Sequence, residues 1–287
     1  MSKKVVLITG TNSGFGYLTA KTLASQGHTV YATIRETNGR NAERARELSI
    51  IENINVVELD VTDPQGVKEV VSNVIDNEGR LDVIVNNAGF YGGGVTETFT
   101  EDDIDKMFDV NLKGVWRLTK AGLPQMRKQQ EGLIINISSG LGRFSAPFMT
   151  VYNSTKFALE GLSEGLHYEL RPLGVDVALI QPGAFPTEIF GKTAYGSDAS
   201  IADQYGELAK IPEQIGVGMG ELFEKVKPDP QMVPNAILEL INSPKGQRPL
   251  RTVVDPATGT FVNDANKDVK EQYDNFLTAF GMQELLN

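Results

Sequence analysis

The chain has 287 residues and a formal net charge of −10; 40% of the residues are hydrophobic and 22% are charged. This composition is that of an ordinary globular protein, and the negative charge disfavours nucleic acid and anionic membrane surfaces as partners. The absence of cysteine excludes disulfides, a thiolate nucleophile and cysteine-ligated metal. The two histidines, His28 and His167, stand far apart in the sequence, which argues against a zinc site or a Ser-His-Asp triad. We therefore assign no metal site, although magnesium or calcium bound by carboxylates is not excluded.

A short apolar run, Val5 to Ile8, stands near the start of the chain. Its β-branched character predicts a strand buried on both faces of a parallel sheet. The run is too short for a secretion signal or a membrane span, so we expect a cytoplasmic protein. A glycine-rich turn and a helical stretch follow, an order that suits a pyrophosphate because backbone N–H groups can approach it at a helix N-terminus. The candidate cofactor-binding residues of the turn are Gly10, Thr11, Asn12, Ser13, Gly14, Phe15 and Gly16.

The second predicted strand, Thr29 to Ile34, is followed by Arg35 rather than ended by an acidic residue. A carboxylate at this place favours NAD, because it binds both ribose hydroxyls and repels a 2′-phosphate. A guanidinium suits a phosphate. Arg35 therefore favours NADP(H), with NAD(H) left possible because Glu36 could neutralise the arginine.

Two further strand ends carry polar or small residues. The strand Val56 to Leu59 is followed by Asp60, which could accept a hydrogen bond from an adenine amino group or cap the next helix. The strand Leu81 to Val85 is followed by two amides and two small residues, which leave room for a ligand. The candidate cofactor contacts here are Asp60, Val61, Asn87, Ala88 and Gly89.

A long helical stretch runs from Glu101 to about Lys128 and carries Asn111 and Gly114 in its middle. Both residue types destabilise a helix interior. We therefore expect either a local break in the helix or simple surface exposure at this place.

The predicted strand Gly132 to Ile137 delivers Ser139, and the helix that follows it, Met149 to Glu169, carries Tyr152 and Lys156. Residues four apart lie on one helix face, so the phenol and the ammonium can point into one site. A cation beside a phenol favours the phenolate. The pair is therefore a candidate acid/base.

The sixth predicted strand, Val175 to Ile180, is followed by Pro182, Gly183 and Thr187. A less regular segment from residue 188 to about 227 follows, which we interpret as a mobile cover of the substrate site. A helix at 228–241, a seventh strand at 250–254 and an amphipathic helix at 264–280 complete the chain. With no repeat or linker, the alternation predicts one doubly wound α/β domain over residues 1–287, with seven parallel strands.

Taken together, these motifs resemble those of the short-chain dehydrogenase/reductase family, and the resemblance spans nearly the whole chain. The matching elements are Thr9-Gly10-x-x-x-Gly14-x-Gly16, Asn86-Asn87-Ala88-Gly89, Asn111, Ser139, Tyr152-x-x-x-Lys156 and Pro182-Gly183 with Thr187.

The resemblance implies a role for each matching side chain. Tyr152 would exchange a proton with the substrate oxygen, and Lys156 would hold the nicotinamide ribose and lower the pKa of the phenol. Ser139 would hydrogen-bond the substrate oxygen, and Asn111 would position a water linked to Lys156. Pro182, Gly183 and Thr187 would hold the nicotinamide.

Two features depart from the family pattern. NADP-dependent members often carry a basic residue at the position of Ser13, so the NADP prediction depends on Arg35. The chain is also longer at its C-terminus than many members, which leaves the form of the expected homo-oligomer, a dimer or a tetramer, open.

The sequence therefore predicts an NADP(H)-dependent oxidoreductase that interconverts a carbonyl compound and an alcohol. Alternatives are an NAD-linked alcohol or hydroxysteroid dehydrogenase and a dinucleotide-sensing protein without turnover. Apolar residues around the site suggest a bulky hydrophobic substrate, although core packing could explain each of them. The candidate substrate contacts are Phe90, Tyr91, Phe144, Phe148, Met149, Phe185 and Phe190.

Overall fold

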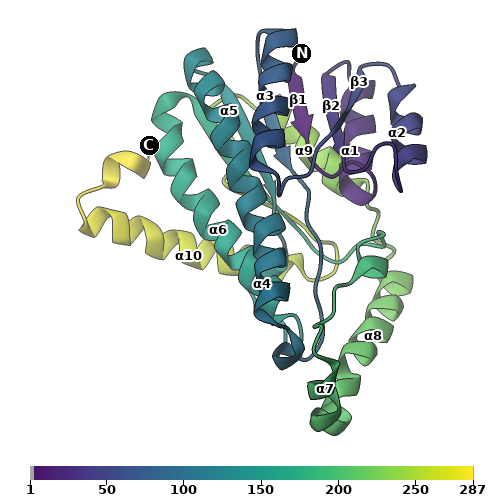
Figure 1. Ribbon diagram of the computed structural model, residues 1–287. Helices are drawn as coiled ribbons and strands as arrows, with labels where there is room; N and C mark the ends of the chain where they lie inside the picture. The colour runs from purple at the N-terminus through teal and green to yellow at the C-terminus, as the bar shows by residue number, and fades with distance from the viewer. Residues whose placement is uncertain (1–2, 287) are drawn as a thin grey trace.

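The computed structural model describes residues 3–286, and its centre is a sheet of seven parallel strands (Figure 1). The strands stand in the order β3-β2-β1-β4-β5-β6-β7. Their bounds are β1 Val5–Ile8, β2 Thr29–Ile34, β3 Ile54–Glu58, β4 Val83–Asn86, β5 Gly132–Ile137, β6 Val175–Pro182 and β7 Arg251–Val254. The predicted doubly wound α/β fold is therefore confirmed.

Helices cover both faces of the sheet and enclose two hydrophobic cores. Helices α1, α2 and α9 pack on one face, and α3, α5 and α6 pack on the other. Along β1, Val6 and Ile8 belong to the first core and Val5 and Leu7 to the second, because successive side chains of a strand point to opposite faces. The bounds are α1 Gly14–Ser25, α2 Ala42–Ser49, α9 Met232–Asn242, α3 Pro64–Glu78, α5 Val115–Gln129 and α6 Thr150–Leu170.

The order of the strands reverses beside β1. The chain lays β2 and β3 on one side of β1 and β4 to β7 on the other. In open α/β sheets, the crevice for ligands lies at the carboxyl ends of the strands where the order reverses. The fold therefore directs the ends of β1 and β4 toward a common site.

A local break interrupts the long predicted helix, as expected. Helix α4, Glu101–Phe108, passes into a π-helical turn at Asp109–Gly114 before α5 begins. Both unusual residues of this turn are buried. A Cβ at Gly114 would lie 2.8 Å from the Val61 side chain, so glycine lets this turn approach the end of β3 closely.

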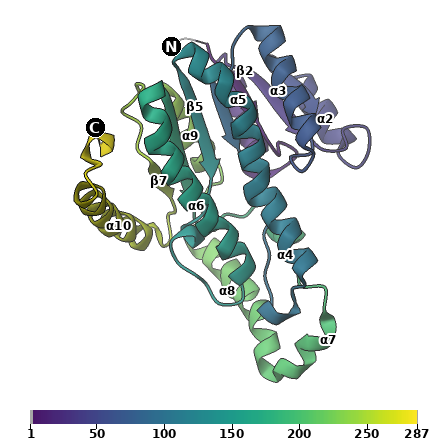
Figure 2. The ribbon, with the colours of Figure 1, turned by 60° about the vertical axis from the view of Figure 1, so that its left-hand side comes forward.

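The segment that follows β6 extends beyond the carboxyl edge of the sheet, as Figures 1 and 2 show. It contains the 3-10 helix η5 Phe190–Lys192, α7 Ala199–Ala202, the 3-10 segment η6 Asp203–Lys210 and α8 Ile211–Val226. The sequence predicted an irregular segment, and this was wrong for its second half, because α8 is a continuous helix. The glycines at 216, 218 and 220 obscured the helical pattern.

Several element bounds differ from the predicted ones. Helix α10, Gly259–Ala279, begins five residues before the predicted start at 264. Helix α9 begins at Met232 rather than 228, because Pro230 disfavours helical backbone at the residue before it. The short 3-10 turns are η1 Thr96–Thr98, η3 Gly140–Gly142, η4 Arg171–Leu173 and η7 Gln283–Leu286. Across residues 3–286, no helix combines the length and apolarity needed to cross a membrane.

Candidate active site

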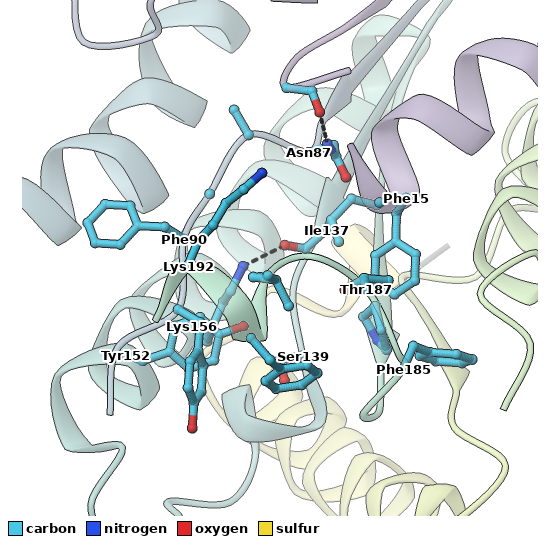
Figure 3. A pocket seen from close by; sticks show the side chains of 18 of the residues that line it. Phe15, Asn87, Phe90, Ile137, Ser139, Tyr152, Lys156, Phe185, Thr187 and Lys192 are labelled. Atoms are coloured by element: carbon cyan, nitrogen blue, oxygen red, sulfur yellow. Dashed lines mark hydrogen bonds between the residues drawn. The ribbon is translucent and has the colours of Figure 1, made fainter. Parts of the chain in front are cut away.

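A cavity of about 750 Å³ lies at the carboxyl edge of the sheet. Most of the predicted site residues line it, including the glycine-rich turn, the ends of β3, β4 and β5, and the segment after β6. Figure 3 shows side chains from these distant parts of the sequence pointing into one hollow. Parallel strands bring their carboxyl ends to one edge, which explains this convergence.

The glycine-rich turn is held close to the end of β4. Gly10 has a φ of +69°, and a Cβ there would lie 2.9 Å from the Ala88 backbone. The Asn87 amide donates to the carbonyl oxygens of Thr9, at 2.8 Å, and Gly10, at 3.0 Å. The Thr9 hydroxyl in turn accepts from the backbone N–H groups of Asn87 and Ala88. These bonds hold the turn against the end of β4, with the N-terminus of α1 facing the cavity.

The cavity extends to a second basic side chain that the sequence analysis missed. Arg35 and Arg40 both line it beside Asn41. Arg35 lies 3.5 Å from the Asp60 carboxylate, and Arg40 lies 3.1 Å from that of Glu36. Glu36 thus pairs with Arg40 and not with the adjacent arginine. A second arginine five residues after the first was a signal available in the sequence.

Asp60 does not cap the helix that follows it. Its carboxylate accepts from the backbone N–H and the hydroxyl of Thr62. Asp63 instead caps α3 by accepting from the Gln65 N–H. Asp60 and Val61 both line the cavity.

Tyr152, Lys156 and Ser139 lie together at the inner end of the cavity (Figure 3). The Lys156 ammonium donates to the Ile137 carbonyl at 2.8 Å and lies 5.6 Å from the centre of the Tyr152 ring. Ser139 is held by its own turn, because its hydroxyl accepts from the Leu141 N–H at 3.1 Å. The end of β5 and the first turns of α6 thereby place three polar side chains around one space.

Burial dominates the protonation of this group. Burial raises the pKa of the Tyr152 phenol, and the Ser139 hydroxyl partly offsets the rise. Burial also lowers the pKa of Lys156 to about 8, against the opposing charge of Glu160. Desolvation is the largest influence on the pKa of the phenol in this structure, and the lowering of that pKa by Lys156 stays a prediction.

Three predicted catalytic or cofactor-binding residues, Asn111, Thr11 and Gly16, do not line the cavity but support its walls. The Asn111 amide group accepts from the Phe90 N–H and donates to the Phe90 carbonyl, both at 3.0 Å, and donates to the Thr155 hydroxyl at 3.1 Å. Thr155 in turn donates to the Tyr152 carbonyl. Thr11 is buried, and its hydroxyl donates to the Thr33 carbonyl. Gly16 also lies outside the lining, and a Cβ there would lie 2.4 Å from the Asn87 amide.

The predicted substrate contacts divide between two cavities. Those that line the large cavity are Phe90, Tyr91, Phe144, Met149, Phe185 and Phe190. Phe148 lines a neighbouring, smaller cavity and not the large one. Phe185 is 1% exposed and packs edge-on against Phe15 with the ring centres 5.5 Å apart, which makes it chiefly a core residue.

Two charged side chains after β6 contact the glycine-rich turn, and the sequence analysis did not single them out. The Glu188 carboxylate accepts from the Gly14 N–H at 3.1 Å. The Lys192 ammonium, which lines the cavity, donates to the Ser13 hydroxyl at 3.3 Å. The only sequence signal for either was its place shortly after Thr187. The contacts bring residues 174 and 179 positions apart together.

Residues 4–196 match the family model of the short chain dehydrogenases. The chain belongs to the short-chain dehydrogenase/reductase family. The crystal structure of a short-chain dehydrogenase from Streptomyces avermitilis is 31% identical, with a TM-score of 0.76 over 98% of each chain. The resemblance seen in the sequence motifs is therefore confirmed.

Two curated oxidoreductases are similar to this chain. A 3-ketodihydrosphingosine reductase of Bacteroides thetaiotaomicron is 38% identical over 218 residues, covering 75% of this chain and 77% of the relative. Human 17-beta-hydroxysteroid dehydrogenase type 1 is 35% identical over 260 residues, covering 85% of this chain and 76% of the relative. The chain is thus an oxidoreductase of this family.

Solved structures of similar short-chain dehydrogenases hold either nicotinamide cofactor. ElxO with NADP bound is 28% identical, with a TM-score of 0.72 over 89% of this chain and 98% of that one. A member from Burkholderia phymatum in complex with NAD is 25% identical, with a TM-score of 0.74 over 94% and 95%. An NAD(P) cofactor is therefore typical of this family, and similar structures hold either form.

Proposed function

We propose that this chain is an NADP(H)-dependent reductase that interconverts a hydrophobic ketone or aldehyde and its alcohol. The observation that carries the proposal is a single cavity with Arg35 and Arg40 at one end and Tyr152, Ser139 and Lys156 at the other. This arrangement suits a phosphorylated dinucleotide whose reactive ring faces an acid and a hydroxyl donor.

The residues of the cavity fit such a cofactor. The Gly14 N–H already binds a carboxylate, so the N-terminus of α1 accepts an anion. The turn would hold the pyrophosphate, and Asp60 and Val61 would contact the adenine. Lys156 would hold the nicotinamide ribose, and residues 182, 183 and 187 would contact the carboxamide. When bound, the cofactor supplies or takes up a hydride.

The protonation of the site favours a proton donor. Because its pKa is raised, the Tyr152 phenol keeps its proton at neutral pH and can give it to a carbonyl oxygen. The Ser139 hydroxyl can donate to the same oxygen and so stabilise the charge that builds in the transition state. Lys156, with a pKa of about 8, can return a proton near neutrality.

The preference for NADP(H) is supported by the guanidinium groups of Arg35 and Arg40, both of which line the cavity. Only Arg35 had been predicted from the sequence. Neither guanidinium is tied into a buried pair. Arg35 lies 3.5 Å from Asp60 and Arg40 lies 3.1 Å from Glu36, and the side chains of both arginines are more than half exposed. Each is therefore available to a 2′-phosphate. Replacing both by alanine should weaken NADPH binding roughly tenfold or more while leaving NADH binding unchanged. Arg46→Ala, on the exposed side of α2, is the matched control.

A hydrophobic substrate is supported by the aromatic and aliphatic walls of the cavity near Tyr152. Tyr91 packs edge-on against the Tyr152 ring, with the ring centres 5.1 Å apart, and against Phe190 at 5.6 Å. The two curated relatives are named for a sphingoid ketone and a hydroxysteroid. Both names denote lipid-like compounds with a carbonyl or hydroxyl group.

The test is to follow NADPH absorbance with a panel of ketones and aldehydes. The wild type should oxidise NADPH, and Tyr152→Phe should lower kcat by at least about a hundredfold while keeping the Kd for NADPH, because it removes only the proton donor. Full activity of Tyr152→Phe would refute the assignment of the donor. Tight cofactor binding with no turnover of any substrate would instead favour the sensor.

A homodimer is proposed on the outer surface of α5 and α6. These helices lie side by side in Figures 1 and 2, and each exposes a large aromatic side chain: Trp116 is 40% exposed and Phe157 is 45% exposed. A second copy of the chain would cover both.

A further inference from the structure

A second cavity of about 230 Å³ adjoins the first one beneath helix α8. Tyr91, Met149, Phe190 and Met219 line both cavities, so these four side chains form the passage between them. Tyr91 also packs on the Tyr152 ring. The second cavity therefore begins beside the proposed proton donor.

One face of α8 forms one wall of this cavity. Its lining residues recur at intervals of three and four, which is the spacing of a single helix face. They are Pro212, Ile215, Gly216, Met219, Gly220 and Phe223. A Cβ at Gly216 or Gly220 would meet nothing within 4 Å. Each glycine destabilises a helix interior by about 1 kcal/mol relative to alanine, and here the two leave a groove that a side chain would fill.

The opposite wall consists of backbone groups that already bond to one another. The Gly93 N–H donates to the Ala194 carbonyl at 3.0 Å, and the Ala194 N–H donates to the Tyr91 carbonyl at 2.9 Å. The Gly94 N–H donates to the carbonyl of Phe148 at 2.8 Å. These bonds remove backbone donors that a polar ligand could use.

The side chains of the cavity offer a ligand little polarity. None of the residues that line it is charged, and its polar side chains are Tyr91, Tyr195 and Thr193. The Thr193 hydroxyl donates to the Phe190 carbonyl at 2.7 Å. Phe148 is fixed in left-handed backbone with a φ of +63°, a costly conformation for a bulky residue. The surface that remains is largely apolar.

We propose that the second cavity binds an unbranched alkyl or acyl chain attached to the carbonyl carbon, and that the substrate is therefore a chain-bearing ketone. The volume is below the ~300 Å³ that small-molecule sites usually have. Tyr91 and Phe190 pack edge-on where the two cavities meet, with the ring centres 5.6 Å apart, so a ligand that reaches the second cavity must pass beside this pair. A flexible chain suits this shape, whereas a fused ring system does not. The proposal rests on the proposed reductase function.

The test is a series of methyl ketones from butan-2-one to tetradecan-2-one, assayed with NADPH. For the wild type, kcat/KM should rise about fourfold with each methylene until the cavity is full. Gly216→Leu and Gly220→Leu should abolish this rise. Gly218→Leu, which lies on the same helix but does not line the cavity, should keep the rise.

Several results would overturn the proposal. One is a kcat/KM that does not change with chain length in the wild type. Another is a rise in kcat/KM with chain length that persists in both Gly216→Leu and Gly220→Leu. A third is a loss of kcat/KM in these two variants that is as large for a polycyclic aryl ketone as for the long-chain methyl ketones. If the wild type reduces no ketone, the proposed function fails, and calorimetric titration with decan-1-ol decides separately about the cavity. Binding that is lost in Gly216→Leu and kept in Gly218→Leu supports the chain site, and equal binding in the two variants refutes it.

Discussion

Lys156 brings a positive charge into the protein interior beside Tyr152. Its ammonium has one hydrogen bond, to the Ile137 carbonyl, and burial lowers its pKa from 10.5 to about 8. Between these two pH values the unfolded chain binds more protons at this residue than the folded chain does. Stability therefore rises with pH across this window, and the penalty for burying the ammonium is fully present below about pH 8.

We expect Lys156→Met to be more stable than the wild type at pH 7, by about 2 kcal/mol. The shift implies about 3 kcal/mol at most, and the Ile137 carbonyl loses its donor in the variant. The difference should shrink as the pH approaches 10.5, because the unfolded chain then begins to lose the proton that the folded chain has already lost. Urea unfolding at pH 7 and pH 10 measures this. A variant that is less stable at pH 7 would contradict the argument.

Glu188 places a carboxylate where the fold favours an anion. It accepts from the Gly14 N–H at the N-terminus of α1, which is the proposed place of the pyrophosphate. The carboxylate and a bound cofactor would thus compete for one donor and repel one another.

Glu188→Gln should therefore bind NADPH about fivefold more tightly than the wild type, because the variant removes the repulsion and keeps a neutral acceptor. Fluorescence titration of NADPH gives the two Kd values. Glu213→Gln, in the first turn of α8, changes the net charge equally and should leave the Kd unchanged. An unaltered or weaker affinity for NADPH in Glu188→Gln would contradict the prediction, because it would mean that the Glu188 carboxylate does not oppose cofactor binding.

At the scale of elements, a buried polar network joins α6 to the turn that carries Ser139. Glu160 of α6 accepts from Gln181 at 2.9 Å and from Arg251 at 2.8 Å, and lies 3.5 Å from the Arg143 guanidinium. Arg143 also donates to Asn266 of α10 at 2.9 Å. The network thus packs the C-terminal helix against the turn that follows β5.

Glu160→Gln should lower the free energy of unfolding by about 3 kcal/mol, since two buried guanidinium groups lose their common carboxylate. Urea denaturation gives the value. Glu164→Gln is the matched control: this carboxylate contacts only Arg251 and is more exposed than Glu160, so its loss should be about 1 kcal/mol. Equal losses in the two variants would mean that the network contributes little beyond a surface ion pair.

At the scale of the whole molecule, the dimer proposal makes a mass prediction. Light scattering after gel filtration should give twice the chain mass of 31.3 kDa, because burying Trp116 and Phe157 of two copies removes four large aromatic surfaces from water. The double variant Trp116→Glu and Phe157→Glu should be a folded monomer. Phe261→Glu, on the exposed side of α10 at 66% exposure, should stay a dimer, and a monomeric wild type would refute the interface.

Most of the fold followed from local patterns, and the errors share one cause. Strands buried on both faces gave continuous apolar runs, so β1, β2 and β5 were predicted with their observed bounds. Helix α8 was missed because it contains three glycines, which have low helix propensity. The π-helical turn was anticipated as a break, but its partner Val61 was not, because their contact spans more than 50 residues.

By itself, the sequence determined the family, the order of the strands and of the motifs that follow them, and the residue types at the candidate site. It could do so because backbone conformation and hydrophobic burial impose patterns on residues that are close in the sequence. Only the tertiary structure decided which side chains meet. Burial raises the pKa of the Tyr152 phenol and lowers that of the Lys156 ammonium. Glu188 reaches Gly14, and Phe148 faces a separate cavity. Solvation and long-range contacts depend on the whole packed chain, and no local pattern records them.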